Sequence, residues 1–504
     1  MRSVRGAPSV ATIPLHAMRE HLTPLDATFL ELEQADDSAH MHIGAIMVFD
    51  PIPQVGAPTR EQVGELLSAR LGQLPRYRQR LSTPHTGGLS WPAWAEVPDF
   101  DVADHLSRAG LPRPGGRAEL AEWSSSFFSE RLDRRRPLWE MVIVEGLAGG
   151  RWALASKTHH CMVDGVGSVD VGHLLLDTSP SPAAAGSAAA DEPMPRGAPS
   201  PTLSALSRVW EGLSPLEGVA HLTERSVHGL LHPRETLSRA GAVTRLIIED
   251  ELHAAPHTSL NEQIGTRRRF EVMRMPLEEM RTIKNALGGT INDVVVTISV
   301  SGLRALLDSR GEALPAAGLR AMVPMNVRLA AERLALGNKI SSLFMDVPIA
   351  DPRTLERYFE TVARSTALKS DGSQARGTDA MLGLAGLAPP VLHSAIAQAL
   401  YATRLFNVTI TNVPGPQQTL YALGAPLREV HPLVPLAAQH AVGVAIVSYD
   451  GNAFFGIVAD RDTVPDLEVM VAAMNAARVE LLEAARPTTK RSPRKPRTPA
   501  KASQ

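Results

Sequence analysis

The residues with the most informative spacing for chemistry are two adjacent histidines, His159 and His160, followed by Asp164 and Gly165. Histidine has the unperturbed pKa that lies nearest neutrality, so an imidazole is a natural general base at pH 7. The Asp-Gly pair lets the chain turn after the histidines, and the aspartate can brace the preceding segment or face a distant cation. The pattern predicts proton removal from a hydroxyl or amine that attacks an acyl group.

The flanking sequence predicts where these histidines lie in the fold. Residues 139–146 and 151–158 are typical of two strands joined by a turn at 148–150. Apolar residues then recur with helical spacing over 166–175. The motif is therefore expected in a strand-to-helix turn, where a side chain faces a cleft while its backbone is held rigidly.

Strand geometry distinguishes the two histidines from each other. Adjacent residues of a strand point to opposite faces, so His159 and His160 are poorly placed to chelate one ion, and we predict no metal site. If the strand stays regular, His160 shares the face of Leu154 and Ser156. We assign His160 as the general base and His159 as a supporting neighbour on the other face. A metal-binding or purely structural histidine pair remains the alternative.

The single cysteine, Cys161, directly follows the histidines and so invites a reading as a nucleophile. At the end of a strand, however, we expect it to pack as a small hydrophobic residue. One cysteine also excludes a disulfide framework and suits a reducing cytosol.

Length and composition limit the classes of protein that fit. A chain of 504 residues predicts two domains or subdomains, and a hydrophobic content of 44% supports sizeable cores. The formal net charge of -2 carries no global signature of nucleic-acid binding. No apolar run is long enough for a transmembrane helix, and the N-terminus does not resemble a secretory signal.

Strand and helix patterns alternate along both halves of the chain, which predicts an α/β or α+β fold. Either Thr290 or Asn292 is expected to cap the helix that follows it. We predict a turn at 412–416 and a hairpin turn at 450–452. The expected strands are 42–49, 319–323, 340–347, 406–411, 441–449 and 453–458, and the expected helices are 59–71, 276–287, 292–308 and 466–485.

Three segments carry no pattern of a packed fold. Residues 1–19 are expected to form a flexible N-terminal extension. Residues 179–201, rich in Ser, Pro, Ala and Gly, predict an exposed linker or insertion. Residues 486–504 hold seven basic and no acidic residues, which predicts a disordered tail, either merely solvated or attracted to anionic lipid head groups.

Several separated motifs together resemble those of the bacterial wax ester synthase/diacylglycerol acyltransferase family, over roughly residues 20–485. The histidine pattern HHxxxDG alone is shared with peptide-synthetase condensation domains and polyketide-associated acyltransferases, and the Asp-Phe-Gly-Trp-Gly motif of plant acyltransferases is absent. The motifs are Pro24-Leu25-Asp26, Met41-His42-Ile43-Gly44, Arg136-Pro137-Leu138-Trp139-Glu140, His159-His160 with Asp164-Gly165, Asn292-Asp293, Asn412-Val413-Pro414-Gly415-Pro416 and Val447-Ser448-Tyr449-Asp450-Gly451.

The resemblance implies a fold and a pair of substrates. It implies two chloramphenicol-acetyltransferase-like subdomains, residues 20–268 and 269–485, with mixed sheets flanked by helices and the active site at their interface. It implies acyl-CoA as a co-substrate with no bound cofactor, and diacylglycerol or a long-chain alcohol as the acceptor. It also implies a cytoplasmic protein peripherally associated with the inner membrane face or with lipid droplets.

The resemblance also implies roles for single residues. His160 is the base, and Asp164 is a structural brace that pairs with an arginine. Gly165 permits the turn or a close approach of substrate. Trp139 belongs to the core or to the wall of a substrate tunnel, and Asn292 either caps its helix or donates to the oxyanion.

Two other functions compete with this one. The first is a condensation-type acyltransferase that takes its acyl group from a carrier protein, but no docking surface or neighbouring synthetase module is visible in the sequence. The second is a catalytically silent protein that binds lipid droplets, which the intact histidine motif disfavours.

Overall fold

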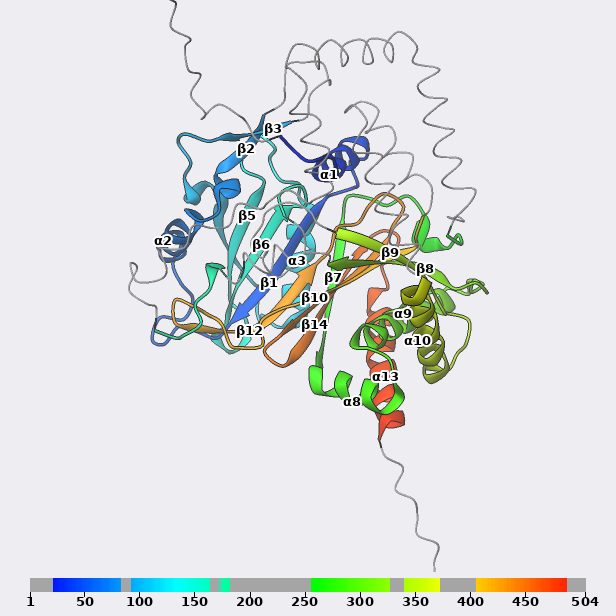
Figure 1. The fold of residues 1–504 in the computed structure, drawn as a ribbon. Coiled ribbons are helices and arrows are strands. Elements are labelled where there is room, and N and C mark those ends of the chain that lie inside the picture. Colours follow the sequence, from blue (N-terminus) through cyan, green and yellow to red (C-terminus); the bar gives the residue numbers. More distant parts are fainter. Residues whose placement is uncertain are drawn as a thin grey trace, which may run out of the picture.

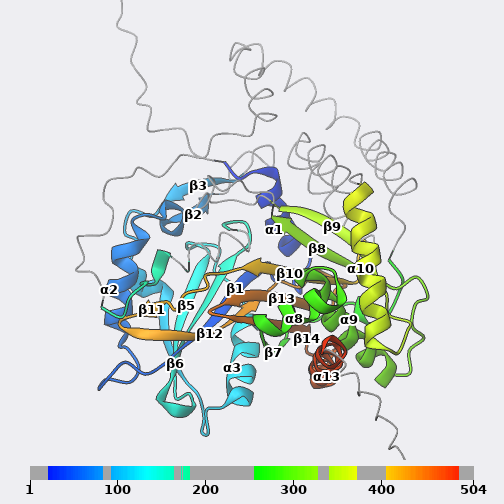
Figure 2. The ribbon, with the colours of Figure 1, turned by 60° about the horizontal axis from the view of Figure 1, so that its bottom comes forward.

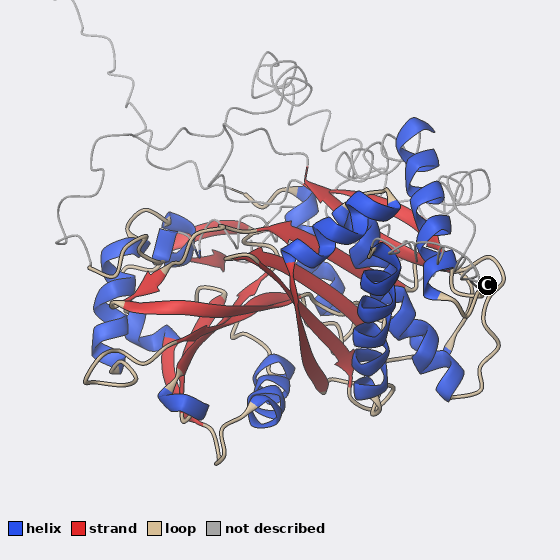
Figure 3. Cartoon of the chain, turned by 90° about the horizontal axis from the view of Figure 1, so that it is seen from below, coloured by secondary structure: helices blue, strands red, loops and turns tan. Residues whose placement is uncertain are grey.

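Two six-stranded sheets dominate the computed structural model, which describes residues 21–82, 92–163, 172, 174–181, 255–326, 340–371 and 405–486. The sheets lie next to each other, and helices flank them (Figure 1, Figure 3). This mixed architecture confirms the predicted fold class. The predicted N-terminal extension, the helix predicted over 166–175 apart from residues 172 and 174–175, the linker beyond 181 and the basic tail beyond 486 lie outside the described residues.

The first sheet has the strand order β11-β12-β1-β6-β5-β4. Its central strand β1 pairs antiparallel with β6 on one side and with β12 on the other. The strands are β1 (His42–Phe49), β4 (Leu106–Gly110), β5 (Trp139–Glu145), β6 (Trp152–His159), β11 (Tyr421–Ala422) and β12 (Ala425–Leu433).

Strands β11 and β12 reach the first sheet from the C-terminal part of the chain. In Figure 2, β12 lies beside β1, with which it pairs, although more than 370 residues separate the two strands in sequence. The proposed boundary between subdomains at residue 268 therefore does not separate the sheets completely, because the later half completes the earlier sheet.

The second sheet has the order β7-β14-β13-β10-β8-β9. Strands β13, β10 and β8 run parallel, while β7, β14 and β9 pair antiparallel with their neighbours. The strands are β7 (Arg268–Pro276), β8 (Leu319–Asn326), β9 (Ile340–Val347), β10 (Val408–Pro414), β13 (Val442–Tyr449) and β14 (Asn452–Asp460); β2 (Gln79–Ser82) and β3 (Ala93–Glu96) form a separate small sheet.

Local sequence signals explain where the helices begin and end. Thr59 and Thr290 each close a capping box at the start of a helix, and Gly288 ends another with a φ of 86°. The helices are α1 (Pro24–Ala35), α2 (Arg60–Leu71), α3 (Arg117–Ser129), α8 (Leu277–Leu287), α9 (Ile291–Ser309), α10 (Thr354–Asp371) and α13 (Leu467–Ala485), with short 3-10 turns at Pro75–Arg78, Val102–His105, Ala148–Gly150 and Ser259–Asn261.

Two sequence predictions need correction. Asn292 does not cap α9, because Thr290 occupies the cap position and accepts the backbone N–H of Asp293. The strand predicted to end at residue 411 continues through Pro414, because β10 stays in register with β13 as far as the pair Pro414 and Ser448. The other strands and helices listed from the sequence are confirmed to within a few residues at each end.

Helix α3 attaches the first sheet to the second by two side-chain hydrogen bonds. The hydroxyl of Ser125 accepts the backbone N–H of Phe270 at 2.9 Å, and that of Ser129 accepts the N–H of Arg268 at 2.7 Å. Both bonds satisfy backbone donors of β7 that have no partner strand on that side. The first half of the chain therefore covers the edge of the second sheet.

Strand β12 also crosses closely over β14. A Cβ atom added to Gly456 of β14 would lie 1.6 Å from the carbonyl oxygen of Pro432 in β12. Two backbones can approach this closely only where one of them carries no side chain.

We expect Gly456→Ala to lower the free energy of unfolding by about 1–3 kcal/mol, because the methyl group must push the two sheets apart. Gly64→Ala is the control: Gly64 lies within α2 with no atom within 4 Å of the added Cβ, so alanine should stabilise by up to about 1 kcal/mol. Urea unfolding measures both. Wild-type stability of Gly456→Ala would show that β12 and β14 do not pack in this way.

Candidate active site

The two histidines lie where β6 ends and the chain turns. His159 is the last residue of β6, and its N–H donates to the carbonyl of Leu138 at 2.9 Å. His160 already belongs to the turn, although its N–H still donates to the carbonyl of Met41, the residue before β1, at 2.8 Å. The strand therefore does not stay regular through His160, and the turn rather than strand alternation sets the direction of its side chain.

The imidazole of His159 is held from both of its nitrogen atoms. Nδ1 accepts the backbone N–H of Cys161 at 3.1 Å, and Nε2 lies 2.9 Å from a carboxylate oxygen of Glu33. An accepting Nδ1 places the proton of the neutral ring on Nε2, which donates it to Glu33. His159 is fully buried, and burial lowers its pKa, so the ring stays neutral.

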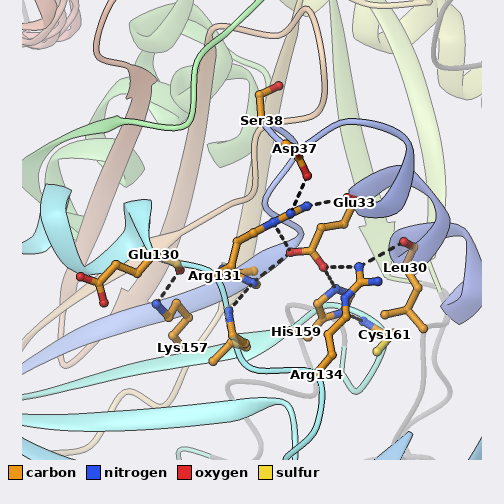
Figure 4. A network of polar contacts seen from close by, with 12 residues as sticks. Leu30, Glu33, Asp37, Ser38, Glu130, Arg131, Arg134, Lys157, His159 and Cys161 are labelled. Carbon is orange, nitrogen blue, oxygen red and sulfur yellow. Dashed lines mark hydrogen bonds and ion pairs between the residues drawn. The ribbon is translucent and has the colours of Figure 1, made fainter. Parts of the chain in front are cut away.

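Glu33 of α1 is the centre of this polar network (Figure 4). Arg134 contacts the same oxygen as His159 at 2.6 Å, and Arg131 lies 3.4 Å from the other oxygen. Burial raises the pKa of Glu33, but hydrogen bonds from His159 and His42 outweigh it and hold that pKa well below its usual range. The carboxylate is therefore charged and buried, with Arg131 and Arg134 balancing its charge and the neutral His159 donating a hydrogen bond to it.

Two further histidines lie beside the network: His42 at the start of β1 and His40 just before it. His42 faces His159 across the β1–β6 pairing, and its Nε2 lies 3.4 Å from Glu33. Burial lowers the pKa of His42 to about 3 and, together with the charges of Arg268 and Arg131, the pKa of His40 to about 4. Despite these histidines, no group of three or more His, Cys, Asp or Glu side chains is arranged to hold a metal ion within the described ranges.

The ring of His160 packs against α1 rather than into the Glu33 network. It stacks on Phe29 with a centroid separation of 4.0 Å and an angle of 10° between the planes. Its exposed fraction is 8%, against 0% for His159. His160 is thus the more accessible of the two imidazoles, and it sits on an aromatic face that fixes its plane.

Cys161 packs as the sequence predicts. Its side chain is fully buried, and burial raises the pKa of the thiol well above its usual value. A buried thiol that stays protonated is a poor nucleophile.

Of the other residues predicted for the site, the structure describes Trp139 and Asn292. Asp164 and Gly165 lie outside the described residues. Trp139 is 1% exposed, donates its indole N–H to the carbonyl of Tyr77 at 2.8 Å and stacks on His105, so it is a core residue. Asn292 lies in the first turn of α9, half-buried and behind the capping residue.

Sequence reasoning missed Glu33 and Phe29 as members of the site. They are four residues apart on α1, so they share one face of the helix, and this spacing was visible in the sequence. The partner they approach lies about 130 residues further along the chain, and nothing local indicates that pairing. His42 was recognised only as part of a motif, not as a contact of Glu33.

The loop between α1 and β1 joins this cluster to the second sheet. Gln263 donates to the carboxylate of Asp36 at 2.9 Å, and the guanidinium of Arg268 donates to the carbonyl of Ser38. Arg268 is 3% exposed at the start of β7. The histidine cluster therefore lies on the side of the first sheet that meets the second.

Comparison with solved structures defines the class of fold. The wax ester synthase/diacylglycerol acyltransferase from Marinobacter aquaeolei VT8 matches with a TM-score of 0.65 and 26% identity over 92% of this chain and 99% of that chain. The first condensation domain of the CDA synthetase matches with a TM-score of 0.56, 15% identity and coverage of 93% and 98%. The second likeness concerns the fold alone.

Sequence comparison narrows the class to a family. Two probable diacylglycerol O-acyltransferases of Mycobacterium tuberculosis, tgs1 and tgs2, are each 31% identical to this chain, over 88% and 92% of it and over 92% and 99% of their own lengths. The catalytic domain of wax ester synthase/diacylglycerol acyltransferase matches residues 22–295, and the C-terminal domain of that family matches 336–481. The chain is an acyltransferase, and it belongs to the wax ester synthase/diacylglycerol acyltransferase family.

The neutral buried histidines predict how stability depends on pH. The unfolded chain takes up protons on His42 and His40 below about pH 6.5, whereas the folded chain does so only near pH 3 and 4. The unfolded state thus binds more protons between these limits, and the free energy of unfolding falls as the pH falls, by up to about 1.4 kcal/mol per pH unit for each histidine.

Urea unfolding at pH 7.5, 6 and 5 tests this slope. His42→Gln should make it shallower, whereas His257→Gln, at a side chain that is 56% exposed, should leave it unchanged. Equal slopes for His42→Gln and the wild type would contradict a neutral buried His42.

Proposed function

We propose that this protein transfers a long-chain acyl group from acyl-CoA to diacylglycerol, to a long-chain alcohol, or to both, with His160 as the general base. The observation that carries the proposal is the placement of His160. Its backbone N–H is bonded to Met41 just before β1, its ring lies flat on Phe29, and it is the more accessible of two adjacent imidazoles in an acyltransferase of this family.

The reaction needs one base. His160 accepts the proton of the acceptor hydroxyl as that oxygen forms a bond to the thioester carbonyl carbon. The tetrahedral oxyanion collapses, the carbon–sulfur bond breaks, and the imidazolium returns the proton to the departing CoA sulfur. A thiolate leaves more readily than an alkoxide, so the intermediate proceeds to the ester without a covalent acyl-enzyme.

The surroundings of His160 suit such a base. The adjacent His159 is buried, as are His42, which contacts it, and His40, which contacts His42; burial lowers the pKa of each, so these histidines remain neutral and add no positive charge to the cluster. Phe29 excludes water from one face of the ring. These features support proton transfer between His160 and substrate rather than exchange with solvent.

The acceptor is inferred from the relatives. The two mycobacterial relatives bear the name of diacylglycerol O-acyltransferases, and the Marinobacter structure that of a combined wax ester synthase and diacylglycerol acyltransferase. Relatedness over about nine-tenths of the chain supports a lipid alcohol as the acceptor, whereas the likeness to the condensation domain is limited to the fold.

Both proposed acceptors, diacylglycerol and a long-chain alcohol, partition into lipid, so we place the protein at the surface of a membrane or lipid droplet. In the part of the chain that the structure describes, no single helix could span a membrane by length and composition. The pair α8 and α9 passes such a test only with a 102° bend between them, and α9 is buried in the core along most of its length. Peripheral attachment is therefore the form of association that we propose.

His160→Ala should lower kcat by about 10²–10⁴-fold, because the acceptor hydroxyl loses its base. The assay follows free CoA thiol after mixing the purified protein with palmitoyl-CoA and either dioleoylglycerol or hexadecanol. Thiol release by His160→Ala at the wild-type rate, or release that does not depend on an acceptor, would refute the proposal.

Cys161→Ala distinguishes direct attack from a covalent acyl-enzyme. Since the thiol is fully buried and held protonated, its removal should change kcat by less than about threefold, within the scatter of a conservative core change. The variant is compared with the wild type in the same assay, with folding checked by circular dichroism. A loss of kcat as large as that of His160→Ala, in a folded variant, would point to a cysteine nucleophile instead.

A further inference from the structure

Helix α1 contacts both rings of the histidine pair, and we infer that it is the positioning element of the catalytic base, with Phe29 and Glu33 as its two contact points. The inference rests on the proposed function, since it assigns these residues to His160 as base. Phe29 stacks on His160, and Glu33 accepts a hydrogen bond from His159. Neither residue touches the reacting atoms in this scheme, so both are positioning residues.

The spacing along α1 makes the two contacts simultaneous. Residues four apart on a helix lie one above the other on the same face, about 5–6 Å apart. At the end of β6, the ring of His159 turns toward the carboxylate of Glu33. The ring of the next residue, His160, turns toward the phenyl group of Phe29. One rigid helix thereby fixes two adjacent imidazoles at once.

The helix itself is held at both ends. Thr23 caps its N-terminus by accepting the N–H of Asp26 at 3.1 Å. At the other end, Arg131 donates to the carbonyl of Glu33 at 2.5 Å and Arg134 to that of Leu30 at 3.4 Å (Figure 4). Cations at the C-terminal carbonyls satisfy free acceptors and favour the helix dipole.

Glu33 acts on His160 only through the neighbouring turn. Its bond to His159 fixes that ring, whose Nδ1 in turn holds the N–H of Cys161. His160 lies between these two residues, and its own N–H is held by Met41. The backbone on either side of the base is therefore fixed, and Phe29 restrains the remaining rotation of its ring.

This arrangement predicts a separable kinetic effect. A misplaced base impairs proton transfer in the transition state but leaves the affinity for acyl-CoA and acceptor unchanged. Loss of a positioning contact should therefore lower kcat and leave KM in place.

The experiment compares Phe29→Leu, Phe29→Tyr and Glu33→Gln with His160→Ala, and with Gln34→Ala as a control at an exposed position of the same helix. Steady-state kcat and KM are measured with palmitoyl-CoA and dioleoylglycerol, and melting temperature by circular dichroism. We expect Phe29→Leu and Glu33→Gln to lose about 10- to 100-fold in kcat with KM within about twofold. Phe29→Tyr, which keeps the stacked ring, should stay within about threefold of wild type, as should Gln34→Ala.

The double variant Phe29→Leu/Glu33→Gln tests whether the two residues act as a unit. Because both restrain the same turn, its loss in kcat should be much smaller than the product of the two single losses. A multiplicative loss would show independent roles and overturn the inference.

The outcomes separate this inference from the proposed function. If His160→Ala is inactive while a folded Phe29→Leu keeps wild-type kcat, only the positioning role of α1 fails. Equal losses in Phe29→Leu and Phe29→Tyr, or a raised KM at constant kcat, overturn it as well. If Phe29→Leu melts at a markedly lower temperature, Phe29→Tyr and Glu33→Gln still decide the question. Wild-type activity of His160→Ala refutes the base, and with it both proposals.

Discussion

A single buried carboxylate, that of Glu33, organises the part of the molecule where the chemistry is proposed. A charged group with 3% exposure is costly unless it is paired and hydrogen-bonded. Here Arg131 and Arg134 supply the opposite charge, and His159 and His42 approach both oxygens. These partners come from β1, β6 and the segment after α3, so this one charge on α1 requires four parts of the chain to be in place together.

The same constraint joins the site to the second sheet. The loop from α1 to β1 is held by Arg268 and Gln263, and α3 is held to β7 by Ser125 and Ser129. Strand β12 then crosses back from the C-terminal part to pair with β1. The histidine pair is thus supported by both halves of the chain, because the later half supplies the strand that completes the earlier sheet.

The local pattern predicted much of the fold. Thr59, Thr290 and the Asp450-Gly451 turn mark element ends because their signals act within a few residues: side-chain caps bond the neighbouring backbone, and Asp450 and Gly451 both have positive φ. The prediction of strand ends and strand partners failed where pairing with a distant strand determines them. Pro414 ends β10 only because β13 lies beside it, and β12 carries no local signal of the sheet that it joins.

For the site, the sequence by itself determined that His159 and His160 stand at the end of a strand and that an acyl transfer base was to be sought there. It also placed Cys161 as packing and supported the family. Only the tertiary structure decided the contacts of the two rings: Glu33 accepts a hydrogen bond from His159, and Phe29 stacks on His160. The reason is that a motif of adjacent residues fixes spacing along the chain, whereas ring direction, burial and charge depend on a helix about 130 residues away.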